Sequence, residues 1–277
     1  MFNHFSEPVS TGAWFVEKPI FEQSIMMQVA ILAVMMVFVV IAIVYAARLA
    51  RQESSRFPLY ICIGIALAAF YEPFGDLFAH VVYHEANQIN FTSAFGFRVP
   101  LWVWPSYVGI FGLPVLILVR KLETSEFSMS WWMPVFFAGV IGGWLWEIPM
   151  IKLGYVEYYG ANAPFKLLGY PIWMGFANGA TMLVVTTAVY FLKHSVVGRH
   201  YPFLIIPMFP MLLMAANGGA ALPLASAINS SDSSAVVNIF AFVSMAAATL
   251  YVWICGQLLA AHGVQARAGA NREARAV

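Results

Sequence analysis

Two glutamates lie inside apolar runs of the chain, where a carboxyl group is costly. Glu72 comes 15 residues after Phe57, in the second run, and Glu147 comes 17 residues after Ser130, in the fourth. At about 1.5 Å of helical rise per residue, both carboxyl groups lie about 22–25 Å along their spans, at a similar depth. A carboxyl group in this position must be protonated, paired or open to a wet cavity, and a protonated one is a usable acid. We therefore predict that Glu72 and Glu147 are catalytic.

The composition shows what kind of secondary structure carries the two glutamates. Of the 277 residues, 61% are apolar and 10% are charged, and the mean hydropathy is +0.77. In a typical soluble domain, roughly a quarter of the residues are charged. Seven apolar runs are each long enough to cross a hydrocarbon core about 30 Å thick. The sequence predicts an all-α polytopic membrane protein with seven transmembrane helices, at 24–48, 57–82, 100–120, 129–153, 171–193, 201–227 and 234–261.

The distribution of basic residues predicts the orientation. Ten of the 14 Lys and Arg residues fall on the side that holds the loops after the first, third and fifth helices and the C-terminal tail. The positive-inside rule then places the N-terminus outside and the C-terminus in the cytoplasm. We expect an extracytoplasmic segment (1–23), a seven-helix domain (24–262) and a disordered tail rich in Ala, Arg and Gly (263–277). The membrane is the bacterial inner membrane or, in a eukaryote, the endoplasmic reticulum.

A short pattern around each glutamate occurs twice. Tyr71-Glu72-Pro73 is followed by a loop and Pro100-Leu101-Trp102, and Trp146-Glu147-Ile148-Pro149 is followed by a loop and Pro171-Ile172-Trp173. The pattern favours a parallel repeat, in which the second and third spans match the fourth and fifth. The preference of Pro and Trp for helix ends at membrane interfaces is the alternative explanation, and it leaves the glutamates unexplained.

Further polar residues follow Glu72 at intervals of four. Asp76, His80 and His84 are expected to continue one helical face toward the outer surface. Asp76 is a third candidate catalytic residue, which would supply protons to the glutamates. The three side chains could also bind a metal, but the other histidines lie in tails or on the opposite side, so we predict no metal site. His80 and His84 would then tune the protonation of the acids or face interfacial water.

Aromatic and amide side chains are expected to line a pocket beside the acids. An interfacial aromatic belt is the ordinary explanation for Trp and Tyr at helix ends, but these rings gather at the outer ends more than at the cytoplasmic ends. A concave aromatic wall binds a large apolar ligand and stabilises positive charge on carbon. The predicted substrate-binding residues are Tyr71, Trp102, Trp146, Tyr158, Trp173, Asn178 and Asn217, with Ser226 as a further candidate for the same cavity.

Several common motifs are missing from the sequence. It contains no Walker A loop, Rossmann glycine pattern, Gly-x-Ser-x-Gly elbow or aspartate-rich motif for a diphosphate, and the last span has no lysine for a retinal Schiff base. We therefore predict no cofactor. No basic face suggests nucleic acid. Cys62 and Cys255 lie within apolar runs and are expected to be small core residues.

These features resemble the membrane-integral terpene cyclases of fungal meroterpenoid and indole-diterpene pathways and their bacterial sesquiterpene counterparts. The resemblance covers the seven spans and the region of Glu72, late in the second helix. It implies that an acidic residue protonates an epoxide or alkene, the polyene closes and a base removes a proton. The family also uses an aspartate in a late helix; the last three spans here hold no acid, so Glu147 would take that role. Glu147, Tyr158, Tyr159, Gly160 and Pro171 also resemble membrane carotenoid hydratases.

Three functions remain open from the sequence. The first is an enzyme that cyclises, isomerises or hydrates an isoprenoid or lipid-like substrate, with a prenyltransferase and an epoxidase upstream in its pathway. The second is a proton- or ion-coupled transporter that uses the same carboxyl groups. The third is a membrane scaffold or sensor without chemistry.

Overall fold

The structure is a computed structural model that describes residues 19–160, 164–231 and 233–276, with side chains described as far as Gly263. In this part of the chain, seven helical stretches are long and apolar enough to cross a membrane. They confirm the predicted all-α polytopic fold, and each starts and ends within four residues of the predicted range. The stretches are Ile25–Gln52, Phe57–Ala79, Val103–Thr124, Met129–Lys152, Ile172–His194, Pro202–Ile228 and Ser234–Gly263.

Three spans change their helix type along the way, whereas the other four are single α-helices. The second span consists of α2 (Phe57–Ala68), the 3-10 turn η2 (Ala69–Tyr71) and α3 (Glu72–Ala79). The third and sixth spans are likewise divided, and α8 joins the fifth to the sixth. The remaining elements are α1 (Ile25–Gln52), α4 (Val103–Ser106), η3 (Tyr107–Gly112), α5 (Leu113–Thr124), α6 (Met129–Lys152), α7 (Ile172–His194), α8 (Val196–His200), η4 (Pro202–Leu204), α9 (Ile205–Ile228) and α10 (Ser234–Ala276).

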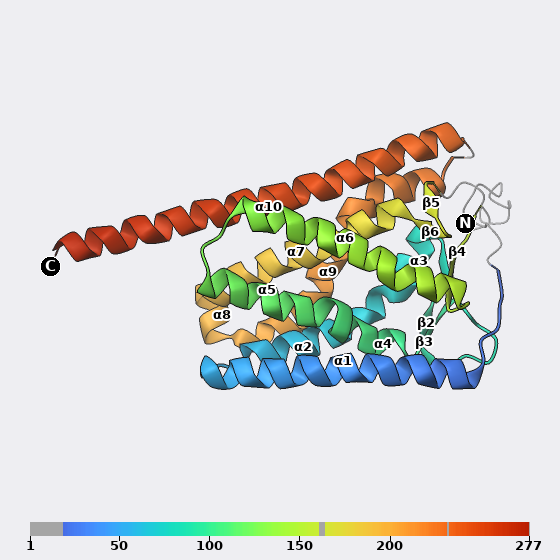
Figure 1. Cartoon of the computed structure of the whole chain (residues 1–277), viewed down its shortest axis with the longest axis horizontal. Coiled ribbons are helices and arrows are strands. Elements are labelled where there is room, and N and C mark those ends of the chain that lie inside the picture. The colour runs from blue at the N-terminus through green and yellow to red at the C-terminus, as the bar shows by residue number, and fades with distance from the viewer. Residues whose placement is uncertain (1–18, 161–163, 232, 277) are drawn as a thin grey trace, which may run out of the picture.

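The helices run roughly side by side along the long axis of the molecule, and six short strands gather at one end (Figure 1). We call this the strand end. Helix α1 starts there, and α10 ends at the opposite end, as an odd number of spans requires. Helix α10 continues to Ala276, where the sequence predicted a disordered tail from residue 263. Ala, Arg and Glu are strong helix formers, which favours this extension of the helix. The orientation relative to the cytoplasm stays a prediction.

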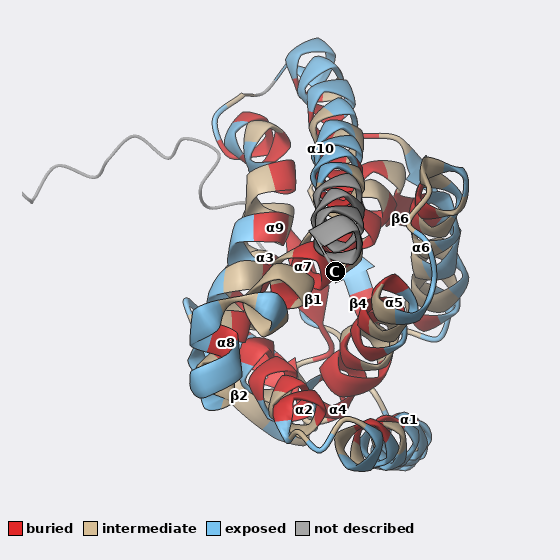
Figure 2. Ribbon diagram, turned by 90° about the vertical axis from the view of Figure 1, so that its left-hand side faces the viewer, coloured by how far each residue is buried: buried red, intermediate tan, exposed pale blue. Residues whose placement is uncertain are grey.

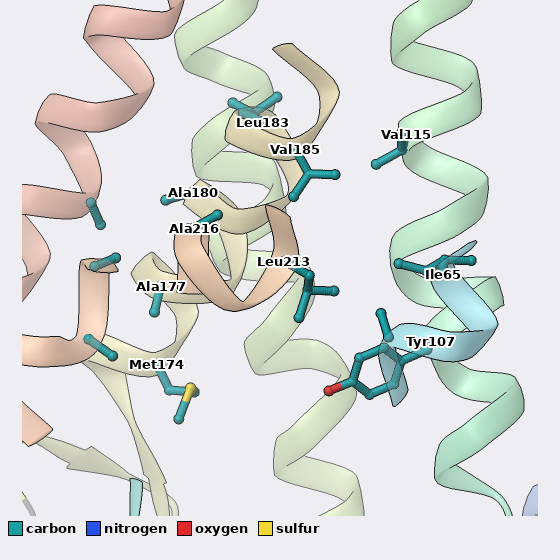
Figure 3. Close-up of a cluster of buried hydrophobic side chains, with 14 of the residues drawn as sticks. Ile65, Tyr107, Val115, Met174, Ala177, Ala180, Leu183, Val185, Leu213 and Ala216 are labelled. Carbon is teal, nitrogen blue, oxygen red and sulfur yellow. The ribbon is translucent and has the colours of Figure 1, made fainter. Parts of the chain in front are cut away.

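Helix α7 is the central element of the bundle. It packs against α5, α6, α9 and α10, and it is surrounded by other helices when seen along the bundle (Figure 2). Small residues allow the close approach of α6, since a Cβ atom on Gly175 would come within 2.4 Å of Trp144 Nε1. On its other side, Ala177 and Ala180 pack with Ala216 of α9 in the buried cluster of Figure 3.

The outward faces of the spans are apolar, as lipid contact requires. On α1, Val37 and Ile41 are exposed, and on α10 Ile239 and Phe242 are exposed. In a soluble protein such faces would associate, whereas lipid chains solvate them. The two cysteines are free and buried inside the bundle, as predicted.

The strands form three two-stranded antiparallel ribbons between the ends of the spans. They are β1 (Val81–Tyr83) with β4 (Val156–Tyr158), β2 (Asn90–Ala94) with β3 (Phe97–Pro100), and β5 (Lys166–Leu167) with β6 (Tyr170–Pro171). The β1–β4 ribbon joins the segment that follows the second span to the segment that follows the fourth. Val81 lies opposite Tyr158, and Tyr83 lies opposite Val156. The ribbon therefore ties together the two regions that carry the glutamates.

The end of the second span differs from the sequence prediction, which continued the helix to residue 82. Helix α3 ends at Ala79 because His80 takes a left-handed conformation (φ 52°) and its backbone N–H bonds to the Asp76 carbonyl. The next three residues, Val81–Tyr83, are β-branched or aromatic and form a strand. The third span contains a π-helical stretch, η3, of a kind found often at functional sites.

Candidate active site

A cavity of about 870 Å³ lies inside the bundle near the strand end. Its walls come from η2, α3, α4, η3, α6, α7 and α9, and the β1–β4 ribbon closes it toward the strand end. Tyr107, Met174 and Leu213 approach this space from three different spans (Figure 3). The ten residues predicted as catalytic or as the main substrate-binding set all line this one cavity: Glu72, Asp76, Glu147, Tyr71, Trp102, Trp146, Tyr158, Trp173, Asn178 and Asn217.

Glu72 is held by two tyrosine hydroxyls from different elements. It is the first residue of α3, directly after the 3-10 turn, and Pro73 follows it in a position that needs no backbone N–H. Tyr83 of β1 donates to Glu72 Oε1, and Tyr107 of η3 donates to Oε2. Each carboxyl oxygen therefore has one phenol partner.

Glu147 is held by Tyr158 and an amide, and the Tyr170 hydroxyl lies beside it. It lies in α6, two residues before Pro149. Tyr158 of β4 donates to Glu147 Oε2, and Asn178 Nδ2 of α7 donates to Oε1 over 3.2 Å. Asn217 Nδ2 of α9 donates in turn to Asn178 Oδ1 over 3.2 Å. A chain of amides thus links α9 through α7 to the carboxyl group on α6.

The two tyrosines on the β1–β4 ribbon reach into the cavity from its roof. Side chains alternate between the faces of a strand, so Val81, Tyr83, Val156 and Tyr158 share the face that lines the cavity. Because Tyr83 lies opposite Val156, it is a diagonal neighbour of Tyr158. Burial, followed by the neighbouring glutamate, raises the pKa of each hydroxyl well above the usual 10.0. Both hydroxyls therefore remain protonated and able to donate.

No basic side chain neutralises either glutamate in the described part of the chain. Pairing with Lys152 or Arg98 near the interface would be the ordinary way to neutralise them. Among the described residues, neither carboxyl group lies within 4.0 Å of a Lys, Arg or His nitrogen. Arg98 Nη1 instead donates to the Glu85 carbonyl over 3.3 Å. The donors that hold the two glutamates are neutral.

Asp76 and the two histidines do not form the single helical face that the spacing predicted. Asp76 is buried and lines the cavity, but the helix ends before His80. The His80 ring stacks on Tyr159 (5.2 Å between centroids) and shares a 3.0 Å hydrogen bond with Asn229. His84 Nδ1 donates to the Tyr155 carbonyl over 3.4 Å. The change of backbone direction at His80 separates these rings from the cavity.

The candidate metal ligands are not brought together. In the described residues, no group of three or more His, Cys, Asp and Glu side chains is placed to hold a metal ion. Burial lowers the pKa of both His80 and His84 below the usual 6.5, so their rings are neutral at pH 7. Ser226, a further candidate for the cavity, is exposed and does not line it.

The rest of the cavity wall is apolar and rich in rings and methionines. The ring centroids of Tyr71 and Phe74 lie 5.7 Å apart. Those of Tyr83 and Trp102 lie 5.5 Å apart, in an edge-to-face arrangement. Such a wall favours an apolar ligand and can stabilise a cation on carbon. The acids, the neutral donors and this wall together suit proton transfer to an apolar molecule.

The sequence missed two partners of Glu72. Tyr83 falls where a loop or the end of a helix was expected, and Tyr107 was seen only as one of many aromatic residues at helix ends. The repeated interval between each glutamate and a tyrosine, Glu72 to Tyr83 and Glu147 to Tyr158, is the same and was a usable signal.

Comparisons with known proteins give no further guide to the chemistry. No protein-family model, no curated protein and no solved structure matches this chain. The functional argument therefore depends on the cavity and its side chains.

Proposed function

We propose that this protein is an integral-membrane enzyme that carries out proton-initiated cyclisation, isomerisation or hydration of an isoprenoid-type substrate. One observation carries the proposal: two glutamates face a single, mostly apolar cavity, which Asp76 also lines, and both glutamates are held there by neutral donors. Two negative charges in one apolar cavity without a cation are costly, so a proton retained by one of the two carboxyl groups is the favoured state. One glutamate is then an acid and the other a base within reach of the same ligand.

The proposed reaction needs no redox partner. A glutamic acid transfers its proton to an alkene carbon, where the π electrons form the new C–H bond, or to an epoxide oxygen, which takes the electrons of the breaking C–O bond. In both cases the other carbon becomes a carbocation. A second double bond attacks this centre and closes a ring, or water adds to it. The other glutamate, ionised, removes a proton from a neighbouring carbon or from the added water. The proton balance is restored when that proton returns to the first glutamate.

The size and position of the cavity support an apolar substrate. Its volume of about 870 Å³ falls in the range of small-molecule pockets, roughly 300–1,000 Å³. Met211 and Leu222 of α9 line the cavity and are also 70% and 57% exposed on the lipid-facing surface. The cavity therefore extends to the side of the bundle, where a lipid-soluble molecule can enter from the bilayer. A prenyltransferase and an epoxidase are the enzymes that would supply such a substrate.

Turnover by the purified protein tests the proposal. The full chain in lipid nanodiscs is incubated with polyprenyl alkenes and their terminal epoxides, and products are separated by mass spectrometry. We expect conversion by the wild type and a loss of about 10²–10⁴-fold in Glu72→Gln and in Glu147→Gln. Full activity of both variants would contradict the mechanism. Uptake into proteoliposomes that both substitutions abolish, without any product, would favour a transporter.

Filling the cavity gives a second test. Gly142 of α6 lines the cavity, and a Cβ atom there would meet nothing within 4 Å. We expect Gly142→Leu to keep the thermal stability and to lower turnover by at least tenfold, because the new side chain occupies substrate space. Gly175→Leu is the matched control, since the Trp144 contact leaves no room and the fold itself should lose stability. Unchanged kinetics in Gly142→Leu would argue against this cavity as the substrate site.

A further inference from the structure

One side of the cavity opens onto the bilayer along α9. The lining residues Met211, Met214, Gly218 and Leu222 follow one another at intervals of three or four, so they share one face of this helix. Met211, Met214 and Leu222 are also exposed on the outer surface. The 11 residues from Met211 to Leu222 extend over about 16 Å of helix. We call this long opening the α9 slot.

The α9 slot lies at the level of the acids. Asn217 on α9 donates to Asn178, which donates to Glu147, both over 3.2 Å. Helix α9 runs toward the strand end, so Met211 lies about 9 Å further from that end than Asn217, and Leu222 lies about 8 Å closer to it. The slot therefore extends past the acids in both directions, and a molecule in the bilayer can approach them from the side.

Tyr71 lies across the α9 slot from Gly218. A Cβ atom on Gly218 would lie 3.7 Å from the Tyr71 hydroxyl oxygen, which is an ordinary van der Waals distance. Both residues line the cavity, and Glu72 directly follows Tyr71 in the chain. The missing side chain at Gly218 leaves space beside the first of the two glutamates, and a larger residue there would fill it.

A chain that enters through the slot cannot continue along the bundle. The β1–β4 ribbon closes the cavity toward the strand end. In the other direction, the deepest lining residues include Pro114 and Met182, and the next residues, Val115 and Leu183, are buried in the packed core (Figure 3). The cavity is therefore shaped for the end of a chain rather than for its middle.

The bilayer provides no hydrophobic reason to enclose a whole apolar chain. Lipid tails are as apolar as the cavity wall, so the transfer of a chain from lipid into the cavity gains little from the hydrophobic effect. A precise fit is needed only where Glu72 and Glu147 meet the reacting double bond. The rest of a long chain is solvated equally well by lipid outside the slot.

We propose that the site accepts the end of an isoprenoid chain that is longer than the cavity, while the rest of the chain stays in the bilayer beyond the α9 slot. Gly218 is the position that keeps the slot open. The reaction at the chain end rests on the proposed function, whereas this way of binding the chain can be measured without turnover.

Photolabelling of the full chain in nanodiscs tests the proposal. The probe is a saturated isoprenoid chain about 30 Å long, as long as the hydrocarbon core is thick, with a bulky biotin group at one end. Because it has no double bond, it cannot be converted. One version carries a diazirine at the free end, and the other carries it next to the biotin.

We expect the free-end diazirine to label the peptides of α3 and α6 that line the cavity, and the diazirine next to the biotin to label lipid instead. If the cavity must enclose its whole ligand, the biotin prevents binding and neither version labels those peptides. That result would overturn the proposal, and so would labelling of the cavity by both versions.

Three variants on α9 test the role of Gly218. Gly218→Leu fills the slot, so free-end labelling of the cavity should fall by about tenfold. Gly218→Ala is the first control and should keep the labelling, because a methyl group fits beside Tyr71. Ser226→Leu is the second, since Ser226 is exposed on the same helix and does not line the cavity. Unchanged labelling in a Gly218→Leu protein that keeps its thermal stability would contradict the role of this residue.

The two proposals can fail separately. If the probes label as expected but no polyprenyl alkene or epoxide is converted, the proposed function fails and the chain-end site stands. If short isoprenoids are converted while the biotinylated chain never labels the cavity, the function stands and the chain-end site fails. Should Gly218→Leu not fold, the two probe versions in the wild type still decide between an open and an enclosing cavity.

Discussion

Two pairs of glutamates, Glu53 with Glu123 and Glu72 with Glu147, lie toward opposite ends of the bundle, and their partners differ in kind. Away from the strands, Lys193 Nζ lies 2.7 Å from Glu53 and 2.6 Å from Glu123, and Arg120 lies 3.8 Å from both. His194 adds a contact of 3.4 Å to Glu123. We call this the ion-pair end. It joins the ends of α1, α5 and α7 with opposite charges.

At the strand end, the pair Glu72 and Glu147 has phenol and amide partners instead. Opposite charges hold a carboxylate permanently ionised, which suits a structural link. Neutral donors in an apolar cavity leave the proton free to move between the acid and a ligand. The comparison separates a group of acids paired with cations from a group that we propose is placed for proton transfer.

The largest effect should come from removing both cavity acids together. Because the acid and the base act in one reaction, Glu72→Gln with Glu147→Gln should lose about 10²–10⁴-fold in turnover, no more than either single variant. The double variant Glu53→Gln with Glu123→Gln is the matched control and should keep turnover in the protein that remains folded. Multiplied losses in the cavity variant would show that the two glutamates act independently and would break the comparison.

The next effect concerns stability at the ion-pair end. Glu123→Gln removes the partner of Lys193 and His194, and we expect a loss of about 1–3 kcal/mol in the free energy of unfolding. Glu147→Gln should change this free energy by less, because the amide can keep contacts to neutral donors. Denaturant titrations in mixed micelles measure both values. A larger loss for Glu147→Gln than for Glu123→Gln would reverse the distinction between the two ends.

A smaller effect should follow from removing the tyrosine hydroxyl of the β1–β4 ribbon that donates to each glutamate. Tyr83→Phe and Tyr158→Phe each remove one donor worth about 1 kcal/mol, so turnover should fall by about fivefold in both. Their equivalent positions predict similar losses. Tyr45→Phe on α1, which does not line the cavity, is the control and should leave turnover unchanged. A loss in only one of the two cavity variants would sharpen the account by showing that the two tyrosine–glutamate pairs contribute unequally.

The smallest effect is the pH dependence at His80. Because its pKa is lowered in the folded protein, the unfolded chain binds a proton at higher pH than the folded one. Stability is therefore complete above pH 6.5 and falls as the pH drops below it, by about 1 kcal/mol or less. His80→Gln should reduce this slope, and His84, whose pKa is lowered as well, should account for the part that remains. A steeper slope in the variant would contradict the sign.

The sequence predicted the spans well because a hydrocarbon core leaves few alternatives. An apolar run long enough to cross the membrane must be a helix. The number of residues between the start of each span and its glutamate then gives the depth of Glu72 and Glu147. The same reasoning placed rings and amides from five spans at one end. Their meeting around one cavity was a reasonable expectation, since they share a depth.

The local structure beyond the spans was less predictable. The β1–β4 ribbon pairs two three-residue strands that are far apart in sequence, and no periodicity reveals such a pairing. The left-handed His80 ended a pattern of four-residue spacing that read as continuous helix. The sequence therefore placed Tyr83 near a helix end, whereas in the structure it lies on a strand and donates to Glu72.

Transfer of solvent deuterium to carbon tests the central claim most directly. Wild-type protein in D₂O, given a polyprenyl alkene, should release a product that carries one deuterium at the carbon that was protonated, and Glu72→Gln should form almost none of it. An alkene is required because deuterium placed on an epoxide oxygen would exchange with water. A product that forms without deuterium from the solvent, or equal labelled product from Glu72→Gln, would contradict the claim that the cavity acids move a proton onto an apolar molecule.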